Sequence, residues 1–296
     1  TDRDYTLTEA PDYLAKVRAY TEAMIEHGRD TFGKTKSPLL LISIDPRTMT
    51  IPNVGSPRGL VVARLPSSFR HCANPHLDQN LYQIMYALSE ITGDRKYARE
   101  ADNTLAHFLN HCQEPRWGFF CWGEHFAWDV KTDAPLKSER DLPHEFQRPW
   151  ILWERSFQLA PNNCKRFADC LWDHQIRHLP DGTISFSRHA MVNSKQTPSR
   201  TGSEYPRHGG FYIATWAEAY RQTGDRRMLE AIRALVKFFE SRRHPDSGAI
   251  PAERHARSKG ELMWPQSNLS LAVDLWDAAA KVPDDLAQQM RNSARQ

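Results

Sequence analysis

The 296-residue sequence contains only five cysteines, and no two of them form a CxxC pair. An odd number without paired spacing argues against both a disulfide framework and a thiolate zinc site. We therefore expect buried free thiols. The cysteines are Cys72, Cys112, Cys121, Cys164 and Cys170.

Long apolar runs are also missing, and no stretch approaches the ~20 apolar residues of a membrane-spanning helix. The first residues, 1–4, do not resemble a signal peptide. We therefore expect no membrane partner and a cytoplasmic or periplasmic location. A secreted form whose signal peptide has been removed is an alternative. A net charge of +3 is too small for a general nucleic-acid partner but suits an acidic ligand.

Signatures of nucleotide and serine-hydrolase chemistry are absent too. The sequence has no P-loop, no GxGxxG after a strand and no GxSxG turn. Phosphoryl transfer, nicotinamide chemistry and serine hydrolysis are therefore disfavoured, and no organic cofactor is expected.

What the sequence does contain is a repeat. Residues 86–94 (YALSEITGD) resemble residues 219–225 (AYRQTGD), and an amphipathic run follows each segment. Gly93 and Gly224 suit the left-handed position after a helix, and Asp94 and Asp225 suit the N-cap of the next helix. Both segments predict a helix, a tight turn and a second helix.

Two more copies extend the pattern. One has helices over 149–159 and 164–178 around a turn at 160–163, and the other has helices over 268–280 and from 286. A further outer helix is expected over 12–30. A two-helix period of about 65 residues predicts an all-α fold, an α/α toroid of helical hairpins, closed or open, with short rim strands. It favours one domain over residues 1–296, with inner helices starting near residues 76, 144, 208 and 267.

Polar segments follow the hairpins at corresponding places. Glycine turns within 116–120, 180–184 and 246–250 lead into the segments 122–125, 186–189 and 251–255. Loops that join one hairpin to the next lie at one end of a helical array. These segments should therefore converge on one rim, although they are far apart in the sequence.

Three of the rim residues suit a metal. His125, Glu145 and His189 would offer two imidazoles and a carboxylate, a set that suits a divalent transition metal with open positions for substrate. For each histidine taken alone, a satisfied rim or core position is the simpler alternative. His208 is a further catalytic candidate, because Gly209 and Gly210 beside it would let the backbone approach a ligand closely.

Other rim residues suit an acidic oligo- or polysaccharide. The guanidinium groups of Arg148, Arg207 and Arg254 match carboxylates in a bidentate manner, although solvated or ion-paired arginines are the simpler alternative. Trp122 and His255 are expected to contact sugar rings, with packing as the alternative for the tryptophan. Nothing in the sequence predicts the oligomeric state.

Three segments carry a resemblance to a known family. Residues 122–125 (WGEH), 144–146 (HEF) and 186–189 (FSRH) resemble, in order and approximate spacing, the active-site segments of polysaccharide lyase family 2, which are pectate lyases with an α/α barrel. The resemblance implies that His125, Glu145 and His189 hold a manganese-like divalent metal and that Arg188 is the base. The hairpins also resemble, more distantly, toroids of the N-acylglucosamine 2-epimerase type.

The implied reaction is β-elimination from a uronate. Cations neutralise the carboxylate, a base removes the C5 proton and the oxygen at C4 leaves. Free arginine has a pKa above about 12, so Arg188 as base implies an alkaline activity optimum. If Arg188 only binds the carboxylate, Lys195 or a neighbouring histidine such as His189 or His208 would serve as base.

Other chemistries stay open at this point. A sugar epimerase would use two proton-transfer groups, such as His125 with His189 or His189 with His255. A glycoside hydrolase would use two carboxylates, and the candidates are Glu124, Glu145, Glu204 and Glu253. A non-catalytic oligouronide-binding protein is a third possibility.

Overall fold

The computed structural model describes residues 12–51, 70–124, 126–137, 144–145, 149–190, 204–251, 253–254 and 261–296. The helices of these ranges are α1 (Tyr13–His27), α2 (Pro75–Thr92), α3 (Lys96–His111), α4 (Trp153–Leu159), α5 (Pro161–Cys170), α6 (Pro206–Thr223), α7 (Arg226–Glu240), α8 (Pro265–Ala278) and α9 (Asp284–Arg295). Within the same ranges, no helix has the length and apolar character needed to span a bilayer.

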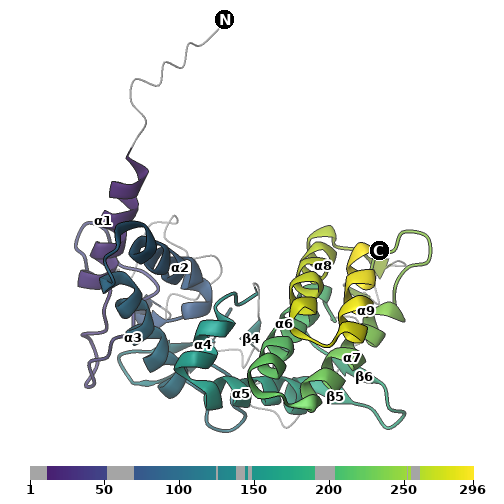
Figure 1. Cartoon of the computed structure of the whole chain (residues 1–296). Coiled ribbons are helices and arrows are strands. Elements are labelled where there is room, and N and C mark those ends of the chain that lie inside the picture. The colour runs from purple at the N-terminus through teal and green to yellow at the C-terminus, as the bar shows by residue number, and fades with distance from the viewer. Residues whose placement is uncertain are drawn as a thin grey trace, which may run out of the picture.

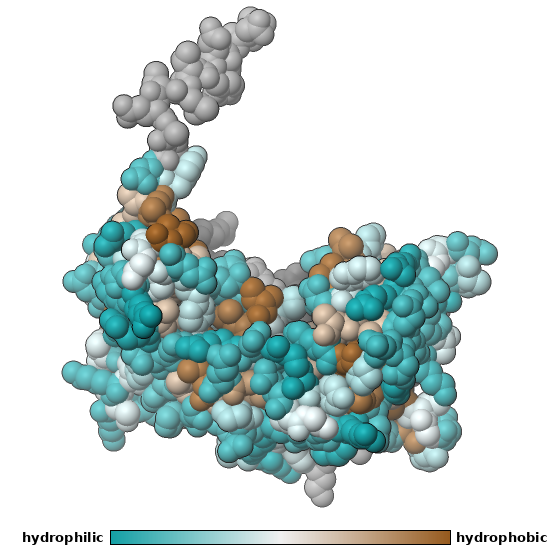
Figure 2. All heavy atoms as spheres, in the orientation of Figure 1, coloured by the Kyte–Doolittle hydropathy of each residue, from teal (hydrophilic) through white to brown (hydrophobic). Residues whose placement is uncertain are grey.

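The helices form an open arc of hairpins in two layers (Figure 1). Helices α4, α6 and α8 contact one another in succession in one layer, and α3 with α5 and α7 with α9 are neighbours in the other. Figure 1 places α1–α3 at one end of the arc and α8–α9 at the other, and Figure 2 shows the surface hollowed between these ends. The predicted all-α hairpin fold is confirmed, and it has the open form.

The strands are short and lie in the connections between hairpins, as predicted for the rim. Three of them, β1 (Cys72–Ala73), β2 (Phe126–Asp129) and β3 (Ala134–Lys137), form one antiparallel sheet. The others form antiparallel pairs: β4 (His144–Glu145) with β7 (His189–Ala190), β5 (Ile176–His178) with β6 (Ile184–Phe186), and β8 (Glu253–Arg254) with β9 (Glu261–Leu262).

The hairpin turns have the predicted chemistry. Gly93 and Gly224 end α2 and α6 with φ of 73° and 70°, a left-handed conformation that glycine adopts without strain. The Asp225 carboxylate caps α7 by accepting from the Arg227 amide at 2.9 Å. The Asp94 carboxylate accepts in the same way from the Lys96 amide at 2.9 Å, although the N-cap of α3 is Arg95.

The prediction for the middle hairpin was wrong in three places. The turn expected at 160–163 is confined to Ala160, because Pro161 occupies the first turn of α5, where its missing N–H costs nothing. The second helix ends at residue 175 in a π-helical turn (Leu171–Gln175), and 176–178 form β5 instead. The inner helix expected near 144 starts at 153, because 144–145 pair with β7 and Pro149 disfavours helix before it.

Aromatic side chains fill the core between the two helical layers. Trp122 is 0% exposed, and its ring centre lies 4.9 Å from those of both Trp150 and Phe120. The five cysteines are free and buried, as expected. Aromatic packing therefore accounts for most of the tryptophan content near the middle hairpin.

Gly209 and Gly210 serve helix packing rather than the close ligand approach expected of them. A Cβ atom on Gly209 would lie 2.3 Å from Phe239 Cζ of α7, and one on Gly210 would lie 2.3 Å from Asp274 Oδ2 of α8. The two glycines thus let α6 contact both neighbouring helices closely. This contact buries the Asp274 carboxyl, whose Oδ2 atom has no hydrogen-bond partner among the described residues.

The buried Asp274 carboxyl predicts an unusual dependence of stability on pH. Burial raises its pKa to about 7, and the charge of Asp277 adds to the shift. Since the folded state holds this proton more tightly than the unfolded chain, the stabilisation is complete below the unfolded pKa of about 4 and is lost as pH rises through about 7. The Asp274→Asn variant cannot ionise, so its gain in unfolding free energy over wild type should grow with pH, to on the order of 4 kcal/mol at about pH 8.

Urea unfolding of wild type and Asp274→Asn at several pH values between about 5 and 8 measures this gain. An exposed control, Asp277→Asn, should show a much smaller change. A gain for Asp274→Asn that stays constant across the range would contradict the prediction.

Candidate active site

The β4–β7 ladder joins two segments that are far apart in the sequence. Its antiparallel register pairs His144 with Ala190 and Glu145 with His189. Residues directly opposite each other in such a ladder lie on one face, with Cα atoms about 4.5–5.5 Å apart. The ladder thus brings two of the three expected metal-ligating residues to adjacent positions.

Buried polar contacts hold the turn that carries His189. Gln175, at the end of the π-helical turn, is 0% exposed and donates from Nε2 to the Ser187 carbonyl at 2.6 Å. The His189 amide donates to Ser187 Oγ at 3.2 Å. The π-helical turn at 171–175 therefore holds the backbone segment that carries Arg188 and His189.

Arg188 lies against the start of α6. Its guanidinium carbon is 4.9 Å from the centre of the Tyr205 ring, and that of Arg207 is 5.5 Å from the same ring. Tyr205 is 1% exposed, whereas both arginines are partly exposed. The centre of the Tyr205 ring also lies 5.9 Å from that of His208 and 5.6 Å from that of Trp264, and both contacts are edge to face. The structure thus brings the predicted residues Arg188, His189, Arg207 and His208 into one region.

Two predicted site residues lie in the interior instead. Trp122, expected to contact sugar, belongs to the aromatic core, and the structure corrects that expectation because its indole has no exposed surface. His208 is likewise 0% exposed. It lies next to the Tyr205 ring, so it supports the region from within rather than facing a substrate directly.

Several predicted residues lie outside the described part of the chain. They are His125, Arg148, Lys195 and His255, together with the side chains of Glu145 and Arg254, whose backbones lie in β4 and β8. Among the side chains that are described, no three His, Cys, Asp or Glu residues are close enough to hold a metal ion. The three-ligand metal site therefore stays a prediction.

Asn74 was missed by the sequence analysis, yet it holds the segment on both sides of His125. It is 0% exposed and donates from Nδ2 to the carbonyls of Gly123 (2.8 Å) and Phe126 (3.2 Å). Its Oδ1 accepts from the Gly123 amide at 2.9 Å. Asn74 precedes Pro75 at the start of α2, so its place at a helix N-terminus was readable, but its long-range partners were not.

Removing the Asn74 amide should be costly. The Asn74→Ala variant leaves the buried Gly123 amide and two carbonyls without these partners, and each such loss costs about 1–3 kcal/mol. We expect the free energy of unfolding to fall by about 3 kcal/mol, measured by urea denaturation. The exposed Asn110, replaced by alanine, is the control and should change stability by less than about 1 kcal/mol. An equal loss in both variants would contradict this account.

The structure describes the side chains of two of the four carboxylates considered for hydrolysis, Glu124 and Glu204. Glu204 is buried, accepts from Ser185 Oγ at 3.1 Å, and lies 3.6 Å from the Arg242 guanidinium. Glu124 is 2% exposed. Both acids are largely buried, and Glu204 borders a pocket together with Arg242. The side chains of the other two candidates, Glu145 and Glu253, lie outside the described residues.

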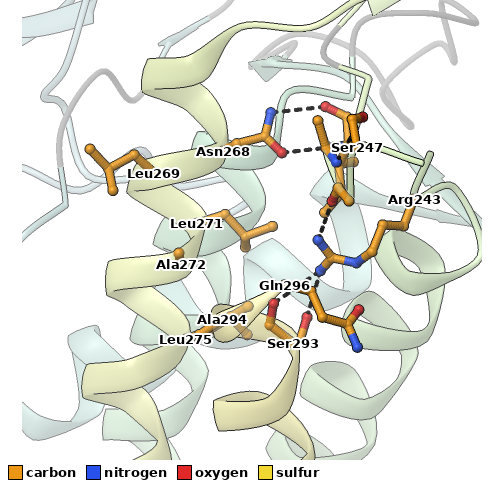
Figure 3. A pocket seen from close by; sticks show the side chains of 13 residues that line it. Arg243, Ser247, Asn268, Leu269, Leu271, Ala272, Leu275, Ser293, Ala294 and Gln296 are labelled. Carbon is orange, nitrogen blue, oxygen red and sulfur yellow. Dashed lines mark hydrogen bonds between the residues drawn. The ribbon is translucent and has the colours of Figure 1, made fainter. Parts of the chain in front are cut away.

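A separate pocket of about 280 Å³ lies between α8, α9 and the loop after α7 (Figure 3). Leucine and alanine side chains of α8 line much of it, and Arg243 beside it donates to Ser293. On the other side of the pocket, the Asn268 side chain accepts from the Ile250 amide and donates to the Ile250 carbonyl. This pocket lies at the end of the arc and contains none of the predicted site residues.

Comparisons with known proteins show which families and proteins this chain is similar to. The model of a family described as periplasmic pectate lyase matches residues 67–208. The pectate disaccharide-lyase of Dickeya dadantii (strain 3937) is 23% identical over 256 residues, which cover 80% of this chain and 45% of the relative. The chain thus spans less than half the length of that relative. The matched range contains the segments 122–125, 144–146 and 186–189, and the resemblance to pectate lyases is confirmed.

Solved structures were compared as well. An unsaturated glucuronyl hydrolase specific for heparin aligns over 74% of this chain and 59% of its own, with a TM-score of 0.48 and 15% identity. The unsaturated glucuronyl hydrolase of Bacillus sp. GL1 aligns over 74% and 60%, with a TM-score of 0.47 and 14% identity.

Proposed function

We propose that the protein is a polysaccharide lyase that cleaves a uronic-acid-containing, pectate-like glycan by metal-assisted β-elimination. The observation that carries the proposal is the β4–β7 register, which sets Glu145 opposite His189, the residue that directly follows Arg188. The match to the pectate lyase family over 67–208 supports the same reading. Because that family is described as periplasmic, we propose a periplasmic location as well.

A divalent transition metal fits the residues proposed to hold it. His125, Glu145 and His189 form a mixed imidazole and carboxylate set, and such sets bind this class of ion. The ladder register, which sets Glu145 opposite His189, supports two members of this set. When bound, the metal would supply positive charge for the uronate carboxylate.

The chain's own residues have separate roles in the proposed reaction. Arg207 attracts the carboxylate, and this acidifies the C5 proton next to it. Arg188, in its neutral form, accepts that proton. The electron pair of the C5–H bond forms the C4=C5 double bond, the C4–O bond breaks, and the leaving oxygen takes up a proton. The products are an unsaturated uronide and a new, shortened chain end.

The proposal is tested with a panel of substrates. Polygalacturonate, polyglucuronate, alginate and a neutral glucan are incubated with the protein and Mn²⁺, and ultraviolet absorbance of the unsaturated product is followed. We expect absorbance to rise with at least one polyuronate, not with the glucan, and to stop on chelation. New reducing ends without absorbance would instead indicate a glycoside hydrolase, and binding without cleavage would indicate an oligouronide-binding protein.

A further inference from the structure

The Tyr205 ring is the common neighbour of two cationic side chains from different parts of the chain. Arg188 follows β6, and Arg207 lies in the first turn of α6, yet both guanidinium carbons lie within 5.5 Å of the centre of this ring. The planar guanidinium group stacks favourably on an aromatic face, and such a contact is strongest where water is excluded. Tyr205 is 1% exposed, so its ring offers a buried surface of this kind.

The ring itself is held firmly. Tyr205 directly precedes Pro206, and its carbonyl accepts from the amides of His208 at 3.0 Å and Gly209 at 3.3 Å. The edge-to-face contacts with His208 and Trp264 restrict the ring from the side. Both arginines keep part of their surface exposed, and Trp264 is 39% exposed. A fixed, buried ring thus contacts two guanidinium groups that both keep part of their surface exposed.

We propose that Tyr205 is a positioning residue, which sets the places of Arg188 and Arg207 for the C5 proton and the carboxylate of one uronate. This inference rests on the proposed lyase function. It assigns a role that neither the repeat nor the resemblance indicated. Because the ring acts by its aromatic face, the phenol hydroxyl is not required.

Two substitutions separate positioning from structure. Tyr205→Phe keeps the ring and should retain kcat within about 3-fold, whereas Tyr205→Leu should lower kcat by about 100-fold, the size of effect that misplaced catalytic groups produce. Tyr212→Leu is the matched control, because Tyr212 is equally buried on α6 but packs against Phe186 and Trp216. The control should retain kcat if it folds.

A second measurement does not depend on turnover. Protons held over an aromatic face resonate upfield, so the Nε–H signals of Arg188 and Arg207 in a ¹⁵N-labelled sample should be shifted upfield in wild type and in Tyr205→Phe. The two signals are assigned with Arg188→Lys and Arg207→Lys. In Tyr205→Leu both should return to ordinary positions.

The two measurements together keep the outcomes distinct. Ordinary arginine signals in wild type would overturn the inference whatever the activity, and so would a loss of kcat in Tyr205→Phe equal to that in Tyr205→Leu. Upfield signals in a wild-type protein that forms no unsaturated product would support the positioning of the arginines but contradict the lyase function on which its catalytic role rests.

Discussion

Replacing Arg188 with alanine is expected to lower kcat on polygalacturonate by about 10³-fold while KM changes little. A group that removes a proton in the transition state typically contributes about 10²–10⁴-fold to the rate. A residue that only bound the carboxylate would act mainly on KM. Steady-state kinetics of Arg188→Ala and Arg188→Lys, with metal content checked in each, measure the difference.

The control for this prediction is another arginine of the same array. Arg233 of α7 pairs with Asp285 at 2.5 Å on the exposed surface, and Arg233→Ala should leave both kinetic constants nearly unchanged. If Arg188→Ala raises KM and keeps kcat, then Arg188 binds substrate and the base is another residue, such as Lys195 or a histidine.

The second large effect concerns metal affinity. His189→Ala should weaken Mn²⁺ binding by at least about 100-fold, since loss of groups that merely support a ligand already costs about 10–100-fold. Titration calorimetry of the metal-free protein measures it. His178→Ala is a suitable control, because His178 belongs to β5, which pairs with β6, and its ring lies against Trp172.

Both outcomes of the calorimetry are informative. Equal affinity in wild type and His189→Ala would remove His189 from the ligand set. If wild-type protein binds no divalent metal at all, the metal assignment of His125, Glu145 and His189 is wrong as a whole, and the epimerase alternative with two histidines gains support.

The hairpins could be predicted because their signals are local. Gly93 and Gly224 end their helices in the left-handed conformation, and Asp225 caps the next helix, as the repeat indicated. The middle hairpin was predicted less well, because its ends depend on tertiary partners. The sequence pattern predicted a helix as far as residue 178. In the structure, residues 176–178 instead pair with 184–186 as β-strands.

The structure tests the arrangement of the candidate site and not the roles of its residues. The resemblance indicated Glu145, Arg188 and His189, and the ladder sets Glu145 opposite His189. Trp122 was misjudged, because a tryptophan next to a rim motif reads the same in sequence whether its indole faces solvent or the core. Tyr205 and Asn74 were missed, since their partners lie at positions that no spacing rule connects.

The central claim is that the protein breaks a uronide bond by elimination and not by adding water. The most direct measurement is mass spectrometry of the products formed from polygalacturonate. Elimination predicts that one of the two fragments of each cleavage is lighter than its hydrolytic counterpart by one water, because its new end carries the C4=C5 double bond. Fragments that all have full hydrolytic mass, with none lighter by one water, would contradict the account.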